Sequence, residues 1–389
     1  MTHKSIPHRF ALIVTILVAL GVAPTAVAGE RIVAVGDIHG NYDGLVSILQ
    51  QAGVVDDDAH WVGGQTTFVQ TGDIFDRGVE IRKVLDLLMR LEDEAAAAGG
   101  EVVALLGNHE GMNLTGFYRD VNPDVFTTFV DGQSKKRRKA AFKDHKKYWR
   151  ARAEALGVEA PVITSEVKDK WMAAFPPGWL EYNEALGPDG RYGAWLRKRS
   201  VAVVIDDVLF IHGGVGPDLA GLSVAAINAE ISEELAAYDR LREVMVERQL
   251  VPATASLGSL ISAYREQNPP DLEFAALADA DKWLIRSSGG PVWFRGAAKW
   301  DEETETGRMV GLLAGVGAQR MVGGHSVQGG GRIGVRFGGR VFLIDTGMLS
   351  SVYEGGRPSA LVIDNGTFSA VYPDGTSEVL VDEALAEAA

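Results

Sequence analysis

Short apolar runs alternate with amphipathic stretches along the first part of the chain. Residues 32–35, 67–71 and 102–106 are rich in β-branched residues and predict strands, and each run ends at a polar turn that contains glycine. Residues 45–51 and 81–98 carry apolar positions at the 3.6-residue spacing of amphipathic helices. This order of strand, turn and helix predicts α/β layers, in which polar groups emerge at the carboxyl ends of the strands.

Later in the chain the pattern changes to hairpins. Residues 201–211 and 360–372 each contain two apolar runs around a two-residue polar turn, which predicts two pairs of antiparallel strands. Parallel units early in the chain and hairpins late in the chain together predict mixed sheets with helices outside them.

Two helical stretches, about 117–199 and 224–250, interrupt this pattern and contain no turn that looks catalytic. We interpret them as insertions into a single domain. The first contains a dense cluster of lysine and arginine between residues 135 and 152. We interpret this cluster as a solvated helix face, and the alternative is a docking surface for an acidic partner.

The N-terminus has the pattern of a targeting segment. Lys4 and Arg9 precede an apolar stretch at residues 10–23, and small residues follow at 26–28. This predicts a secretory signal peptide at residues 1–28, cleaved after Ala28, with an uncleaved membrane anchor as the alternative. We therefore expect a single domain over residues 29–389, a periplasmic or secreted location, and no stable membrane insertion after cleavage.

The amino-acid composition excludes several classes of site and of partner. With 46% hydrophobic and 23% charged residues the chain has the balance of a folded globular protein. It contains no cysteine, which excludes disulfides, thiolate metal sites and enzymes that attack through a cysteine. With a formal net charge of -14 the chain as a whole would repel nucleic acid and anionic lipid, so any binding of anions must be local.

Five glycine-rich loops carry the candidate chemistry, and four of the eight histidines lie in them. Each loop places an oxygen or nitrogen ligand just after an apolar run, where glycine lets the backbone turn sharply. Five such loops together indicate one shared site. The loops are Gly36–Gly40, Gly72–Gly78, Gly107–Glu110, His212–Gly214 and Gly323–Ser326.

Aspartate, asparagine and histidine without cysteine form a ligand set that suits manganese, iron or zinc. Two such ions that share a carboxylate lie about 3.5–4 Å apart, where they can bind a phosphoryl oxygen and activate a bridging water. This chemistry hydrolyses phosphate esters without a covalent intermediate on the protein. Arg77 and Arg295 could bind phosphate oxygens in forked geometry, and His109 could protonate the leaving oxygen.

The loops GDIHG, GDIFDRG, GNHE, HGG and GGHS, in this order, resemble the metal-dependent phosphoprotein phosphatase family of the calcineurin-like metallophosphoesterase superfamily. WFRG at 293–296 and DTGM at 345–348 resemble its Shewanella-like branch, some members of which act on phosphotyrosine. The resemblance covers residues 31–364. It implies an α/β fold, a four-layer sandwich of two mixed β-sheets flanked by helices, here with helical insertions.

The resemblance also implies a role for each loop residue. Asp37, His39 and Asp73 would hold one metal ion, and Asp73 as a bridge, Asn108, His212 and His325 would hold the other. His109 would be the general acid, polarised by Asp76, and Arg77 and Arg295 would bind the phosphate.

We therefore expect an exported phosphatase that hydrolyses phosphomonoesters by attack of a metal-bridging hydroxide. Its substrates would be phosphoproteins carrying phosphoserine, phosphothreonine or phosphotyrosine. The first alternative is a small-molecule phosphatase or a symmetrical dinucleoside polyphosphate hydrolase, and the second is a catalytically silent protein that binds metal. The chain has no match to the Ser-Ala-Pro-Asn-Tyr loop of the eukaryotic Ser/Thr enzymes, so the preference of those enzymes does not transfer to it.

Overall fold

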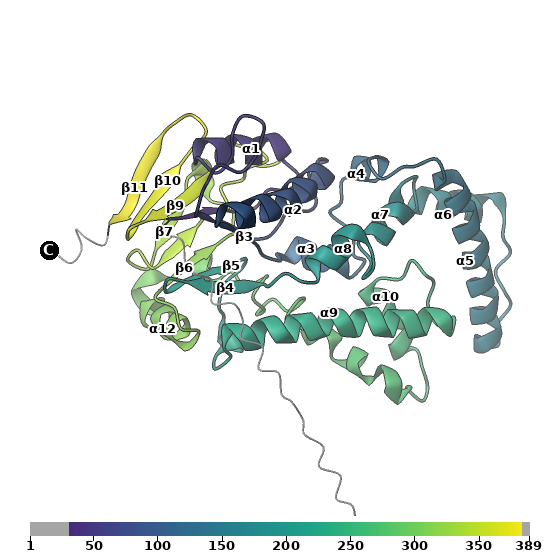
Figure 1. Cartoon of the computed structure of the whole chain (residues 1–389). Helices are drawn as coiled ribbons and strands as arrows, with labels where there is room; N and C mark the ends of the chain where they lie inside the picture. Colours follow the sequence, from purple (N-terminus) through teal and green to yellow (C-terminus); the bar gives the residue numbers. More distant parts are fainter. Residues whose placement is uncertain (1–30, 383–389) are drawn as a thin grey trace, which may run out of the picture.

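The computed structural model describes residues 31–382. The predicted signal peptide and its cleavage site lie outside these residues. In the described part, two mixed β-sheets lie between helices, and a group of further helices extends to one side (Figure 1). Both the α/β class and the mixed sheets were predicted, and both are confirmed.

The first sheet has six strands in the order β11-β10-β9-β1-β2-β3. Its first three strands along the chain pair in parallel, and the last three pair antiparallel to one another and to β1. The predicted hairpin around Asn365 is the β9–β10 pair. The strands are β1 (Arg31–Val35), β2 (Thr67–Gln70), β3 (Glu101–Ala104), β9 (Ala360–Asp364), β10 (Thr367–Val371) and β11 (Ser377–Asp382).

The second sheet has five strands in the order β4-β5-β6-β8-β7. Strands β5, β6 and β8 pair in parallel, and β4 and β7 are antiparallel edge strands. The predicted hairpin around Asp206 is the β4–β5 pair. The strands are β4 (Ala202–Ile205), β5 (Val208–Ile211), β6 (Arg320–Gly323), β7 (Gly334–Arg336) and β8 (Val341–Leu343).

Successive side chains of a strand point to opposite faces of its sheet, so the apolar side chains form two separate core layers. Ile32 and Ala34 of β1 belong to a buried cluster between the two sheets, in which Phe342 of β8 stacks on Phe368 of β10 with ring centroids 4.7 Å apart. The intervening residue Val33 belongs to the cluster under the outer helices. The result is the predicted sandwich of helices, sheet, sheet and helices.

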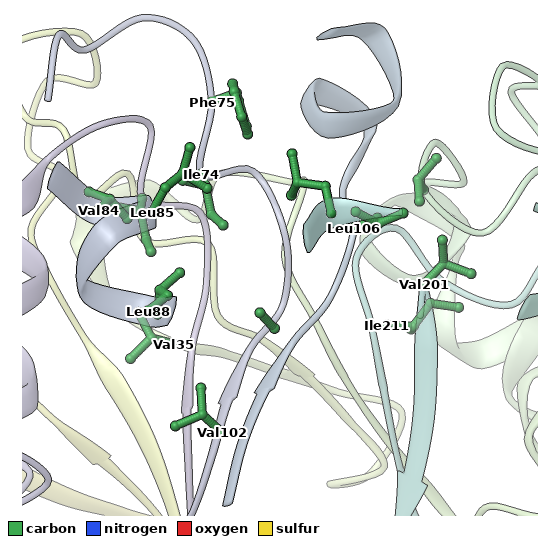
Figure 2. Packing of buried hydrophobic residues seen from close by; sticks show 14 of the residues in the cluster. Val35, Ile74, Phe75, Val84, Leu85, Leu88, Val102, Leu106, Val201 and Ile211 are labelled. Atoms are coloured by element: carbon green, nitrogen blue, oxygen red, sulfur yellow. The ribbon is translucent and has the colours of Figure 1, made fainter. Parts of the chain in front are cut away.

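Helices α1 (Tyr42–Gln51) and α2 (Ile81–Ala98) cover the outer face of the first sheet, as the spacing of their apolar residues predicts. Figure 2 shows Leu85 and Leu88 of α2 near Val35. On the other side, α9 (Val224–Glu247) and α12 (Glu302–Gly315) contribute buried residues to the cluster that packs on the second sheet.

The segment from 117 to 199 forms five helices beside the sandwich (Figure 1). Among the described residues, no helix combines the length and the apolar character needed to cross a membrane. The five are α4 (Pro123–Thr127), α5 (Ser134–Leu156), α6 (Ser165–Ala174), α7 (Trp179–Ala185) and α8 (Arg191–Leu196). The remaining α-helices are α3 (Asn108–Leu114), α10 (Leu257–Arg265) and α11 (Gly296–Lys299).

Candidate metal centre

The five predicted loops meet at the carboxyl ends of the parallel strands. Loops after β1, β2 and β3 come from the first sheet, and loops after β5 and β6 come from the second. The six predicted ligands are all buried, with exposed fractions of 5% or less. They are Asp37, His39, Asp73, Asn108, His212 and His325.

Several of these residues have unusual backbone conformations. His39, Asp73 and His325 have φ angles of 47°, 60° and 66°, in the left-handed region that residues other than glycine rarely adopt. The carbonyl oxygen of Asp73 accepts hydrogen bonds from the backbone N–H groups of Ile38 and His39, which ties the first two loops together. Such strain persists only where surrounding contacts fix it, and it concentrates at functional sites.

His39 lies between two carboxylates with its unprotonated nitrogen toward them. Its Nδ1 is 2.7 Å from the carbonyl oxygen of Phe75, which can only accept a hydrogen bond, so Nδ1 carries the proton. Burial lowers the pKa of His39 to about 4, which leaves the ring neutral at pH 7. Its Nε2 therefore presents a lone pair to Asp37 and Asp73, each 3.9 Å away. Acceptors that face one another in this way fit a cation between them.

The histidines of the second sheet are oriented in a similar way. His212 donates from Nδ1 to the carbonyl oxygen of Thr71 at 3.0 Å, and its Nε2 lies 2.9 Å from Asn108 Oδ1 and 3.2 Å from Asp73 Oδ2. The Nε2 of His325 is 3.1 Å from the carbonyl oxygen of Trp293, and burial lowers the pKa of His325 to about 3. Its Nδ1 is therefore unprotonated.

Asp73 is common to the two groups of side chains that are close enough to hold a metal ion. One group is Asp73 with His39 and His109, and the other is Asp73 with His212 and His325. Burial alone would raise the pKa of Asp73, but His212 and His109 hold it well below its ordinary value. The central position fits the bridging role that the sequence predicts for this residue.

Asp37 and Asp345 show that this part of the site carries excess negative charge. Burial, together with the nearby carboxylates of Asp345 and Asp73, raises the pKa of Asp37 well above its ordinary value. Burial also raises the pKa of Asp345 to about 6. Buried carboxylates this close to each other require a compensating cation, and hard oxygen donors beside neutral imidazoles suit a divalent metal. The residues therefore fit a metal centre.

His109 differs from the other three histidines because a carboxylate lies behind it. Its Nδ1 is 2.5 Å from Asp76 Oδ2, and Asp76 also accepts a hydrogen bond from Asn113, which in turn accepts one from Tyr182. Burial opposes the charged form, yet Asp73 and Asp76 raise the pKa of His109 to about 9. At neutral pH the ring is therefore protonated, as a general acid must be.

The two predicted phosphate-binding arginines approach the site differently. Arg77 is half-buried, its Nη2 is 3.3 Å from His109 Nε2, and its buried Nε has no hydrogen-bond partner among the described residues. Arg295 is exposed and donates from Nη1 to the carbonyl oxygen of His325 at 2.7 Å and to Ser326 Oγ at 3.1 Å. The structure thus places both arginines beside the metal-ligand loops, while the roles of all ten predicted residues remain predictions.

Three further residues of the site are not among the ten for which the sequence predicts a metal, catalytic or phosphate-binding role. The Glu110 carboxylate accepts hydrogen bonds from the backbone N–H groups of Gly107, Asp73 and Ile74 at 2.6–2.8 Å, which joins two of the loops. Asp345 lies next to Asp37. Tyr353 lies with its ring 6.0 Å from that of His39 and 5.3 Å from the guanidinium carbon of Arg77.

An apolar pocket of about 180 Å³ adjoins the centre. Met112, Phe117, Ile285 and Trp293 line it, and Arg286 is the charged residue of its wall. The Trp293 ring lies edge-on to the ring of His325 with centroids 5.9 Å apart. A group bound in this pocket would therefore lie next to the metal-ligand loops.

Comparisons with known proteins agree with this geometry. The profile of calcineurin-like phosphoesterases matches residues 30–329. Shewanella-like protein phosphatase 2 of Arabidopsis thaliana is 31% identical over 210 residues, which cover 52% of this chain and 51% of that protein. The chain thus spans about half the length of that relative. Shewanella-like protein phosphatase 1 of Plasmodium berghei is 23% identical over 321 residues, which cover 82% and 67% of the two chains.

Among solved structures, the cold-active protein-tyrosine phosphatase of a psychrophilic Shewanella species superposes with a TM-score of 0.59 at 26% identity. The superposition covers 90% of this chain and 80% of that one. The fold, the clustered ligands and the profile match all identify the same class of enzyme. The chain belongs to the calcineurin-like phosphoesterase family and is a metal-dependent phosphatase, of the kind that uses a dinuclear metal centre.

Proposed function

We propose that the chain is a phosphoprotein phosphatase that hydrolyses phosphomonoesters at a two-metal centre, with phosphotyrosine as its preferred residue. The observation that carries the proposal is the central position of Asp73, whose Oδ2 lies 3.9 Å from His39 Nε2, 3.2 Å from His212 Nε2 and 3.8 Å from Nε2 of the protonated His109. Metal ligands and a proton donor are thus adjacent. Relatives named as protein phosphatases support the same class of substrate.

In this proposal Asp37, His39 and Asp73 hold one ion, and Asp73 with Asn108, His212 and His325 holds the other. Manganese, iron or zinc would suit these donors. Such ions, when bound, act as Lewis acids toward phosphoryl oxygens and make a coordinated water a nucleophile at neutral pH. The chain itself orients the imidazoles, because each of the three ligand histidines donates its other N–H to a backbone carbonyl.

His109 would protonate the leaving oxygen of the substrate. Its Nδ1 is held by Asp76, so the proton available for transfer is on Nε2, which lies 3.3 Å from Arg77 Nη2. A phosphate bound by Arg77 would therefore place its leaving oxygen near this proton. Arg295, on the loop of His325, would bind the phosphate from the second sheet.

The pocket beside Trp293 distinguishes the substrate classes. Its volume of about 180 Å³ is below the roughly 300–1,000 Å³ of sites that enclose drug-sized ligands, so it suits one side chain better than a dinucleoside. Its walls are mainly apolar, and the hydroxyl of Thr115 is already donated to backbone carbonyls. An aromatic ring fits this environment, which supports phosphotyrosine, the residue named for the Shewanella enzyme.

The test measures kcat/KM on one peptide sequence that carries phosphotyrosine or phosphothreonine, and on a dinucleoside tetraphosphate. We expect the order phosphotyrosine, phosphothreonine, dinucleoside. Gly258 lines the pocket, and a Cβ there would have only ordinary contacts, so Gly258→Leu would fill the pocket without a clash at the backbone. This variant should lose the preference for phosphotyrosine, and Gly258→Ala, as the matched control, should keep it. Fastest hydrolysis of the dinucleoside would refute the protein-substrate proposal.

We also propose that the protein is exported to the periplasm or secreted. The support is the order of basic residues, apolar stretch and small residues before Ala28. Sequencing the N-terminus of protein recovered from the extracytoplasmic fraction should find Gly29 as the first residue. Recovery of the full chain, with Met1 or Thr2 at its end, would contradict cleavage.

A further inference from the structure

The basic cluster on α5 forms a single stripe along one face of this helix. At 100° per residue, seven of its basic residues fall within an arc of about 120° that is about 22 Å long. Six of the seven are exposed and Lys146 is half-buried. This basic stripe consists of Lys135, Lys136, Lys139, Lys143, Lys146, Lys147 and Arg150.

The other basic residues of α5 point elsewhere and are bound to the protein. Arg137 forms an ion pair with Glu181, and Arg152 forms one with Glu266. Arg138 donates to the backbone carbonyl oxygens of Met172 and Phe175. The helix thus uses arginines to attach itself to its neighbours and presents mostly lysines to solvent.

The stripe itself has few partners. Lys147 pairs with Asp144 and Lys146 lies over the Phe142 ring, while the other five have no ion pair among residues 31–382. Solvated helix faces usually intersperse charges of opposite sign, and like charges four residues apart destabilise a helix. An anionic surface placed against the stripe would remove this repulsion.

The shape of the stripe indicates what that surface is. The stripe lies on the exposed face of α5, and Lys147 also lines one of the described pockets. Helix α5 stands at the end of the molecule opposite β11 (Figure 1). Charges beyond about 10 Å are largely screened at physiological salt, so the net charge of -14 does not prevent this end from approaching an anion.

We propose that the basic stripe of α5 docks the protein on an anionic lipid bilayer. A flat anionic surface can contact side chains along the whole length of the stripe and needs no groove. Lysine suits this contact, because its compact charge needs no forked partner, and clusters of four to eight basic residues on a helix are typical of binding to anionic headgroups. The contact is peripheral and concerns a face of the molecule other than the metal centre.

The experiment measures co-sedimentation of the full chain with vesicles of phosphatidylglycerol and phosphatidylcholine, and with vesicles of phosphatidylcholine alone. One variant changes Lys135, Lys139, Lys143 and Lys146 to Gln, which keeps good helix formers. The matched control changes four exposed lysines elsewhere to Gln, and so has the same net charge. These are Lys168, Lys198, Lys282 and Lys299.

The stripe variant should partition onto the anionic vesicles at least about 100-fold more weakly than the native chain, and the control should lose much less. Binding through the apolar stretch at residues 10–23 would be equal in all three proteins and would persist on neutral vesicles. Hydrolysis of p-nitrophenyl phosphate should be the same in all three, which checks that they are folded.

Two results would overturn the proposal. The first is equal binding of the stripe and control variants to anionic vesicles. The second is binding of the native chain to soluble polyglutamate, lost in the stripe variant, without binding to anionic vesicles; the occupant would then be an acidic protein.

Discussion

Four histidines meet at the metal centre. They fall into two groups according to the hydrogen-bond partner of one ring nitrogen, which is either a backbone carbonyl or a carboxylate. His39, His212 and His325 each place one ring nitrogen within 3.1 Å of a backbone carbonyl oxygen, which carries no formal charge. Burial then keeps His39 and His325 neutral, with a lone pair toward the carboxylates. His109 has Asp76 in the corresponding place, and Asp73 together with Asp76 raises its pKa to about 9.

The comparison shows that one residue type can supply ligands and a proton donor within a single buried site. Burial lowers the pKa of His39 and His325 and also opposes the charged form of His109, so the difference comes from the carboxylates that act on His109. A neutral carbonyl fixes the tautomer and leaves the ring unprotonated, whereas a carboxylate stabilises the imidazolium.

The largest effect is expected for Asp73→Asn, because Asp73 belongs to both candidate metal groups. The variant should lose metal from both positions, and its turnover should fall by more than the roughly 10–100-fold that is typical for removing a group that only supports a ligand. Metal analysis of the purified protein checks this, with His39→Gln as the comparison that should lose less metal. Two ions per chain and near-normal turnover in Asp73→Asn would show that the bridging assignment is wrong.

The next largest effect is expected for His109→Asn. General acids contribute about 10²–10⁴-fold, so turnover should fall by this amount on a phosphopeptide while the metal content stays near normal. The loss should be smaller on p-nitrophenyl phosphate, whose leaving group departs without a proton. Turnover on both substrates and the metal content are measured on the same enzyme preparation. If His109 were a metal ligand, the variant would lose metal. An equal loss of turnover on both substrates would exclude the general-acid role.

Asp76→Asn should lower the pKa of His109 toward the low pKa values of the ligand histidines His39 and His325. Asp73 and the charge of the partner Asp76 raise the pKa of His109 to about 9, so the protonated form is present below about pH 9 and is lost above it. Without that charge the pKa falls, and the alkaline limb of the kcat profile should move to lower pH. Turnover should drop by about 10–100-fold at pH 8 and by less at pH 6. A profile with an unchanged alkaline limb would contradict the assigned partnership.

An effect of similar size is expected for Arg295→Lys and Arg77→Lys, which keep the charge but lose the forked geometry. Loss of one charged hydrogen bond, about 1.5–3 kcal/mol, would reduce kcat/KM by roughly 10–150-fold. Arg295 also holds the loop of His325, so melting temperature is measured alongside activity. A large fall in melting temperature with normal kcat/KM would assign Arg295 a structural role instead.

Much of the fold follows from local pattern, because the strands are apolar runs that end at glycine-rich turns. The ends of the strands are less predictable. The apolar run at 102–106 predicts a strand through Leu106, yet β3 ends at Ala104. The backbone N–H of Leu106 instead bonds to the carbonyl oxygen of Ser200, just before the second sheet. That contact depends on residues far apart in the sequence, which no local pattern reports.

The residues that the sequence analysis missed differ in whether a sequence pattern could have indicated their roles. Asp345 follows a short apolar strand, as Asp37 and Asp73 do, so the same rule applied once more would have found it. Glu110 was visible as a residue of GNHE, but its three backbone donors come together only when the loops meet. Helical spacing likewise places the residues of the basic stripe on one face of α5. The ion pair of Arg137 with Glu181 does not follow from that spacing.

The ligands come from both sheets, and this affects how the protein folds. The backbone N–H of His325 bonds to Asp37 across 288 residues of chain, so the centre closes a long loop at a cost in chain entropy. Contacts of such separation form late in folding, after the local strand pairings. We therefore expect metal ions to bind the finished structure and to stabilise it by mass action, so that chelation should speed its loss to proteases.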